Sequence, residues 1–194
     1  MNLFLWGALP YIAFTFLIVG TLVRFFYFER NWTTKSSQFL EKKQLRIANP
    51  LFHFGLLCVI GGHVVGVLIP KTWTAAIGIN DHMYHQGALY MGAVAGLIFI
   101  VGFLLLMKRR FTVAELKVNT SGIDKWLYLF LTLAIFSGMA GTLLNASGFF
   151  DYRVSIGPWF RSLISFMPDP SLMEGVPFMF KFHMLAWKIG RAHV

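Results

Sequence analysis

The sequence predicts an all-α membrane protein, built as a bundle of five transmembrane helices. The composition indicates this class, because 57% of the 194 residues are hydrophobic and only 13% are charged. Four long runs contain no Asp, Glu, Lys or Arg, and each approaches the roughly 20 apolar residues that a helix needs to cross a bilayer core of about 30 Å. The runs lack the polar face of a soluble helix and the alternation of a membrane β-strand. They are Met1–Val23, Leu51–Ile69, Met83–Met107 and Trp126–Phe150.

The expected helices follow these runs in order. The first covers about Leu3–Tyr27, and we expect it to be retained, because the N-terminal run has no basic start and no small-residue cleavage site. The second begins at Pro50, a favourable first-turn position, and ends before Pro70. The remaining helices are expected at about Met83–Met107, at about Trp126–Asn145 and from about Val176 onward.

Basic residues gather in two connections and predict the topology. Most of the net charge of +9 lies in the loops Arg24–Asn49 and Lys108–Lys125, whereas the alternate connections contain few Lys and Arg. The positive-inside rule then places the two basic loops in the cytoplasm and the N-terminus outside. The charge is therefore a topology signal and does not indicate nucleic-acid binding. We expect residues 148–177 on the outer surface, with Trp159 and Phe160 at the membrane interface.

The fifth helix has too few residues before the end of the chain to cross a bilayer. The last six residues, IGRAHV, match the translation of a common sequencing-adapter DNA in one reading frame. We therefore expect one transmembrane domain over residues 1–188 and a non-native tail over residues 189–194. On this interpretation His193 is not counted as a functional residue.

Two histidines lie in the otherwise apolar second helix, which reads LFHFGLLCVIGGHVVGVLIP from Leu51. His53 and His63 are separated by about 15 Å along the helix and about 80° around it, so both can face the bundle interior. His183, near the outer start of the fifth helix, lies at the depth of His63, so one iron could bridge these two side chains. His53 would need a partner deeper in the fifth helix, beyond the last residue of the chain.

A haem suits this pattern better than zinc. One imidazole from each of two helices completes a six-coordinate haem iron, whereas a zinc site normally adds cysteines or carboxylates. Gly55, Gly61, Gly62 and Gly66 would let a flat macrocycle approach the backbone. Alternatively, Gly62 and Gly66 form a helix-packing seam and the histidines bond across helices. A transporter or channel that relays protons through histidines, without haem, is a further alternative.

A second pair of histidines lies at the outer rim of the third helix, in the run NDHMYHQ. Near an outer haem, His85 could bond a quinone carbonyl and accept a quinol proton. The alternative is that His82 and His85 are plain interfacial residues beside Tyr84.

Two clusters of charged residues can be explained without a direct role in haem or quinol binding. Lys108, Arg109 and Arg110 fix the topology, or alternatively pair with haem propionates at the inner face. Asp151 and Arg153 are expected to form a loop ion pair of little energetic weight.

Several motifs together resemble one family, the gamma, or cytochrome b, subunit of respiratory nitrate reductase. They are TTKSSQFLEKK, LFHFG with GGHVVG, DHMYH, KRRFT, FDYR with PWFR, and PFMFKFH, and they extend to about Trp187. The resemblance implies a membrane-anchor subunit with five helices and two b haems. It implies that His63 and His183 hold the distal haem iron. His53 would hold the proximal haem iron together with a histidine late in the fifth helix.

The resemblance also implies a route for electrons. Menaquinol or ubiquinol would be oxidised at the outer face, near His85 and Gln86. The electrons would pass through both haems to an iron–sulfur beta subunit and a molybdenum alpha subunit on the cytoplasmic side, which hold the nitrate-reducing site. The expected location is the cytoplasmic membrane of a bacterium or an archaeon, in contact with lipid. A cytochrome b subunit of another quinone-linked reductase is the alternative within this class.

Overall fold

The computed structural model describes residues 2–27 and 41–191, and the regular elements in these two ranges are helices. Residues 28–40, which belong to the first basic loop and contain most of its TTKSSQFLEKK motif, lie outside the described residues. His193 in the expected tail lies outside them as well.

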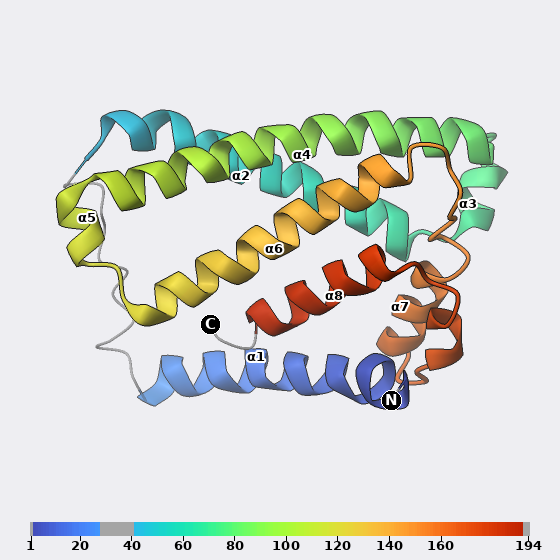
Figure 1. Ribbon diagram of the computed structural model, residues 1–194. Helices are drawn as coiled ribbons and strands as arrows, with labels where there is room; N and C mark the ends of the chain where they lie inside the picture. Colours follow the sequence, from blue (N-terminus) through green and yellow to red (C-terminus); the bar gives the residue numbers. More distant parts are fainter. Residues whose placement is uncertain (1, 28–40, 192–194) are drawn as a thin grey trace.

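Four long helices run antiparallel to their neighbours along the molecule (Figure 1). The first consists of a π-helical segment, Leu3–Ala8 (η1), followed by α1, Leu9–Tyr27. The second is α2, Lys43–His63, extended by a π-helical segment, Val64–Leu68 (η4). The other two are α4, Asp81–Thr112, and α6, Gly122–Leu144. All four are long and apolar enough to cross a membrane, as expected for an all-α membrane protein.

Short helices lie at both ends of the molecule. The N-terminus, α3 (Lys71–Ala76), α7 (Ile156–Ile164) and the 3₁₀ turn η5 (Pro170–Met173) lie at one end, here named the α7 end (Figure 1). The opposite end, named the α5 end, carries α5 (Ala114–Val118).

The last helix, α8, covers Phe178–Arg191 and returns from the α7 end toward the middle of the molecule (Figure 1). In this view it runs between α6 and α1, and it packs mainly on α6. Its 14 residues correspond to about 21 Å of helix. The expectation of a fifth membrane-crossing helix is therefore not confirmed by the described residues.

Capping residues explain where two of the long helices begin. The Asn80 side chain accepts a backbone N–H of the first turn of α4 at 2.9 Å, and Ser121 and Asp124 form a capping box at the start of α6.

The expected start of the second helix at Pro50 is wrong, because α2 begins at Lys43 and continues through the proline. The polar residues before Pro50 extend the helix beyond its apolar stretch, although a proline inside a helix removes one backbone hydrogen bond.

Two glycines allow α2 and α4 to cross in close contact. A methyl group on Gly55 would lie 2.5 Å from the backbone nitrogen of Phe99, and a methyl group on Gly102 would overlap the backbone of Phe52. The backbones of α2 and α4 can therefore touch, because Gly55 and Gly102 carry no side chain at the points of contact. The buried core beside this crossing consists of Phe99, Phe103 and Ile135, so it joins α4 to α6 as well.

A second core closes the α7 end and corrects one expectation. Trp159, expected at the membrane interface, is only 2% exposed and donates its indole N–H to the Trp6 carbonyl at 2.9 Å. Phe160 is partly buried against the same core. The apolar residues of α7 lie on one face, and this face turns inward. The buried residues are Trp6, Ile156, Trp159, Leu163, Met173 and Val176.

Large apolar side chains also cover the outside of the long helices. Phe16 of α1, Leu57 of α2 and Leu97 of α4 are each more than half exposed. A soluble monomer rarely exposes such extended apolar surface. The surface is therefore suited to contact with lipid and with other apolar partners.

Candidate functional site

The imidazole rings of His63 and His183 lie close together near the α7 end. His63 is the last residue of α2, and His183 lies in the first half of α8. Their ring centroids are 6.0 Å apart, and the ring planes are inclined by 32°. The two side chains meet although α2 packs mainly on α4 and α8 packs mainly on α6. His63 and His183 therefore lie at the same depth in the helix bundle, as the sequence predicts.

Backbone carbonyl groups fix the orientation of both rings. The Nδ1 of His63 lies 2.7 Å from the Val59 carbonyl oxygen, and the Nδ1 of His183 lies 2.9 Å from the Ala134 carbonyl oxygen on α6. A carbonyl oxygen can only accept, so each Nδ1 carries a proton and donates it. In a neutral ring the Nε2 then has a free lone pair, which is the usual arrangement of a metal-binding histidine.

Ser137 of α6, which was not among the residues expected from the sequence, makes a second polar contact with His183. Its hydroxyl oxygen lies 3.2 Å from the Nδ1 of His183, and the serine is only 6% exposed. The hydroxyl also donates to the Leu133 carbonyl within its own helix. The signal available in the sequence was a serine followed by a glycine in the middle of an uncharged run.

His53, nearer the α5 end of α2, shows the same ring orientation. Its Nδ1 lies 2.9 Å from the Asn49 carbonyl oxygen, which leaves Nε2 with a free lone pair. The ring is exposed and meets Phe52 edge to face. In the part of the chain that the structure describes, no second imidazole contacts it. Its expected partner late in the fifth helix therefore stays a prediction.

The His63–His183 pair suits a single metal ion held between the rings. An imidazole nitrogen binds a metal at about 2 Å. Two such bonds, together with the distance from each nitrogen to its own ring centroid, separate the two centroids by roughly 6 Å. Within residues 2–27 and 41–191, no three His, Cys, Asp or Glu side chains gather as a metal site. Two imidazoles alone suit an ion whose other positions are already filled, as in haem, and not a tetrahedral zinc.

His85 lies in the first turns of α4 and contacts the turn that follows α6. Its Nε2 lies 3.2 Å from the Ala146 carbonyl oxygen, so Nε2 donates and Nδ1 remains as an acceptor. Gln86 is half-buried beside it, and His82 is exposed. Among the described residues, no contact joins His85 to His63. The expected role of His85 in quinol binding stays a prediction.

Lys71 connects three segments at the α7 end. Its Nζ lies 2.8 Å from Asp81 at the start of α4 and 3.1 Å from Asp151 in the segment after α6. Hydrogen bonds to these two carboxylates raise the pKa of the Lys71 ammonium above its ordinary value. This ion-pair cluster closes the end of the bundle nearest His63.

The expected ion pair between Asp151 and Arg153 is wrong. Asp151 turns to Lys71 and accepts only the backbone N–H of Arg153, at 2.9 Å. The Arg153 guanidinium is buried, lies 3.7 Å from the centroid of the Tyr84 ring, and donates to the Thr74 hydroxyl at 2.8 Å. The arginine therefore joins α3 to the start of α4.

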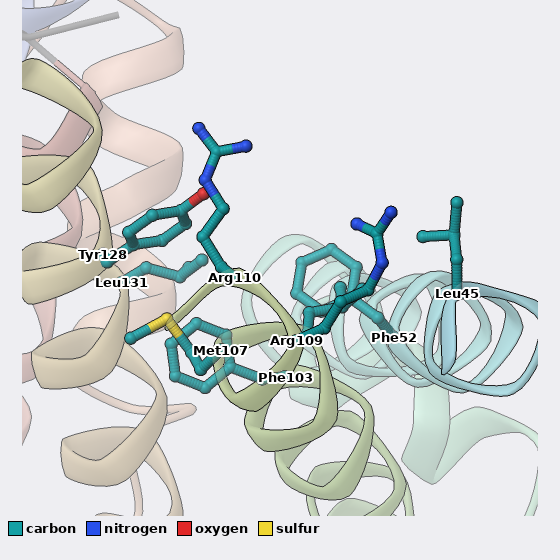
Figure 2. A pocket seen from close by; sticks show the side chains of 9 residues that line it. Leu45, Phe52, Phe103, Met107, Arg109, Arg110, Tyr128 and Leu131 are labelled. Carbon is teal, nitrogen blue, oxygen red and sulfur yellow. The ribbon is translucent and has the colours of Figure 1, made fainter. Parts of the chain in front are cut away.

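At the α5 end, a pocket of about 200 Å³ opens between α2, α4 and α6 (Figure 2). Arg109 and Arg110 border it, and both are already paired with carboxylates, at 2.8 Å to Glu41 and at 3.1 Å to Asp124. These pairs favour the structural role of the basic cluster over binding of haem propionates. The lining residues are Leu45, Phe52, Phe103, Leu106, Met107, Arg109, Arg110, Tyr128 and Leu131.

Comparison with known proteins decides the family. The family model described as "Nitrate reductase gamma subunit" matches residues 2–189. The chain belongs to the nitrate reductase gamma subunit family. It is 46% identical over 182 residues to the nitrate reductase gamma chain of Bacillus subtilis, which covers 93% of this chain and 82% of that protein.

More distant relatives agree with this membership of the gamma subunit family. The respiratory nitrate reductase 1 gamma chain of Escherichia coli is 27% identical over 187 residues, covering 95% of this chain and 83% of that protein. The nitrate reductase-like protein NarX of Mycobacterium tuberculosis is 39% identical over 183 residues, which are 93% of this chain but 28% of that protein. The family predicted from the histidine motifs is thus confirmed.

Proposed function

We propose that this gamma subunit is the membrane cytochrome b of a respiratory nitrate reductase. In this role it oxidises quinol and delivers electrons to an iron–sulfur beta subunit and a molybdenum alpha subunit. The observation that carries the proposal is the His63–His183 pair, two imidazoles whose centroids lie 6.0 Å apart and whose Nδ1 atoms each contact a backbone carbonyl, which leaves the Nε2 lone pairs free. Membership of the gamma subunit family favours nitrate reductase over other quinone-linked reductases.

His63 and His183 would hold the iron of the distal haem. His53 would hold the iron of the proximal haem, together with a second histidine of the fifth helix. When bound, the haems supply one-electron transfer between a two-electron quinol and the partner subunits. The chain itself holds the donor nitrogens ready, because a backbone carbonyl accepts the Nδ1 proton of each of the three histidines.

His85, with Gln86 beside it, would bind the quinol headgroup at the outer face. The Nε2 of His85 donates to the Ala146 carbonyl, so its Nδ1 can accept a hydrogen bond and then the proton of a quinol hydroxyl. The ring can then pass that proton on to the outer solution. The apolar tail of the quinol would lie against the exposed apolar surface of the long helices.

The α5 end would face the cytoplasm and the α7 end the outside. Basic residues at the end of α4 and in the connection after it, such as Lys108 and Lys117, support this orientation through the positive-inside rule. The beta and alpha subunits would then dock at the α5 end, which is nearer to His53 than to His63. Proton release outside and nitrate reduction inside would together charge the membrane.

Optical spectra of the purified protein test this proposal. We expect the dithionite-reduced minus oxidised spectrum to show a b-type haem, and we expect a quinol to reduce it. The exposed His82 supplies the control, since His82→Ala should leave this spectrum unchanged. A folded, membrane-inserted protein without haem absorbance would contradict the proposal and favour the histidine proton relay of a transporter.

A further inference from the structure

Gly138 of α6 lies directly against the imidazole of His183. A methyl group at this position would lie 2.8 Å from Cε1, 3.2 Å from Nδ1 and 3.5 Å from Nε2 of the ring. Carbon atoms in contact prefer a separation of about 3.5–4.0 Å, so an alanine would force the ring to move. The observed position of His183 therefore requires a glycine here.

The ring of His183 has little freedom to accommodate such a shift. Its Nδ1 is held by the Ala134 carbonyl at 2.9 Å and lies 3.2 Å from the Ser137 hydroxyl, both on the same face of α6 as Gly138. The centroid of the His63 ring lies 6.0 Å from that of the His183 ring, with the two planes inclined by 32°. A ring pushed away from Gly138 therefore lengthens its hydrogen bonds to α6 and changes its distance and angle to the His63 ring.

We infer that Gly138 is a positioning residue that sets the width of the gap between His183 and His63. The inference rests on the proposed function, because this width matters for chemistry only if the pair binds one iron. A ring displaced toward His63 would leave too little room for an iron bound by one nitrogen of each ring, because each such bond is about 2 Å long. A ring displaced sideways changes the distance and the angle between the two imidazoles that the pair needs to share one iron.

Gly141, one turn further along α6, offers a matched control. It faces the same helix α8, but a methyl group there would lie 3.8 Å from the nearest atom of the Phe180 ring, an ordinary van der Waals contact. Gly138→Ala and Gly141→Ala make the same change in the same helix against the same neighbour. Both substitutions change helix propensity by the same amount. A difference in haem binding between the two variants therefore reports the contact with His183.

Haem content and the electron paramagnetic resonance spectrum of the oxidised protein provide the test. Iron with two imidazoles is low-spin, and iron that has lost one of them becomes high-spin. We expect Gly138→Ala to lose the low-spin signal of the His63–His183 haem, and Gly141→Ala to keep it. A wild-type signal in Gly138→Ala would overturn the inference and leave the proposed function standing. A wild-type protein without haem would overturn both.

A double variant covers the case in which Gly138→Ala does not fold, as judged by gel filtration in detergent. Because His183→Ala removes the imidazole, it also removes the collision. We therefore expect Gly138→Ala combined with His183→Ala to fold as well as His183→Ala alone, and this result would support the inference. If the double variant also fails to fold, the methyl group disrupts helix packing in general, and the inference is overturned.

Discussion

Arg109 holds Glu41 by two contacts at the α5 end. Its Nε donates to the Glu41 carboxylate at 2.8 Å, and a terminal nitrogen donates to the Glu41 main-chain carbonyl at 2.8 Å. The arginine is only 4% exposed, so its charge is withdrawn from water and depends on this partner. The contact ties the end of α4 to the residues that lead into α2.

This contact predicts acid sensitivity. The Gln44 backbone N–H and the Arg109 guanidinium lower the pKa of the Glu41 carboxyl below its ordinary value of 4.5. A lowered pKa contributes stability that is fully present above 4.5 and is lost as the pH falls through the lower, folded-state value. We therefore expect Glu41→Gln to unfold at a lower temperature at neutral pH and to lose less stability on acidification. Thermal unfolding in detergent measures both, and identical pH dependence in the two proteins would contradict the assignment.

The crossing of α2 and α4 predicts a contrast between two glycines of one helix segment. Gly55→Ala places a methyl group 2.5 Å from the Phe99 backbone nitrogen, whereas a methyl group on Gly61 meets nothing within 4 Å. We expect Gly55→Ala to destabilise the protein by roughly 1–3 kcal/mol, as overpacking does. Gly61→Ala should be neutral or slightly stabilising, because alanine favours helix. Denaturant unfolding of both variants provides the comparison, and equal stabilities would mean that the helices do not cross this closely.

The proposed quinol site predicts a kinetic defect without loss of haem. His85→Ala removes one hydrogen bond to the quinol, which corresponds to about 1–3 kcal/mol and thus to roughly a 5- to 150-fold slower reduction of haem by quinol. Dithionite should still reduce all the haem. His82→Ala, an exposed neighbour on the same helical turn, is the control. Stopped-flow absorbance measures both rates, and a wild-type rate in His85→Ala would make that residue a plain interfacial histidine.

The long helices and the matching depth of His63 and His183 were predictable because they depend on local pattern. An uncharged run of sufficient length specifies a membrane helix, and the helical rise fixes the depth of each histidine. The orientation of His63 also follows locally, since its Nδ1 bonds to a carbonyl of the preceding turn.

Other features depend on neighbours that are distant in the sequence, and sequence reasoning missed them. Trp159 is buried because Trp6 supplies a carbonyl acceptor for its indole N–H. Arg153 does not pair with Asp151, two residues before it, because the Asp151 carboxylate pairs with Lys71. Gly138 is one of several small residues in its run, and only the packing of α8 reveals that it faces His183.

Haem content in variants of the two facing histidines tests the central claim most directly. If His63 and His183 hold the same iron, then His63→Ala and His183→Ala each lose that one haem. The double variant then loses no more haem than either single variant. Pyridine haemochrome assays normalised to folded protein measure this. An unchanged haem content in His63→Ala, or a loss in the double variant that is the sum of the two single losses, would contradict a shared iron.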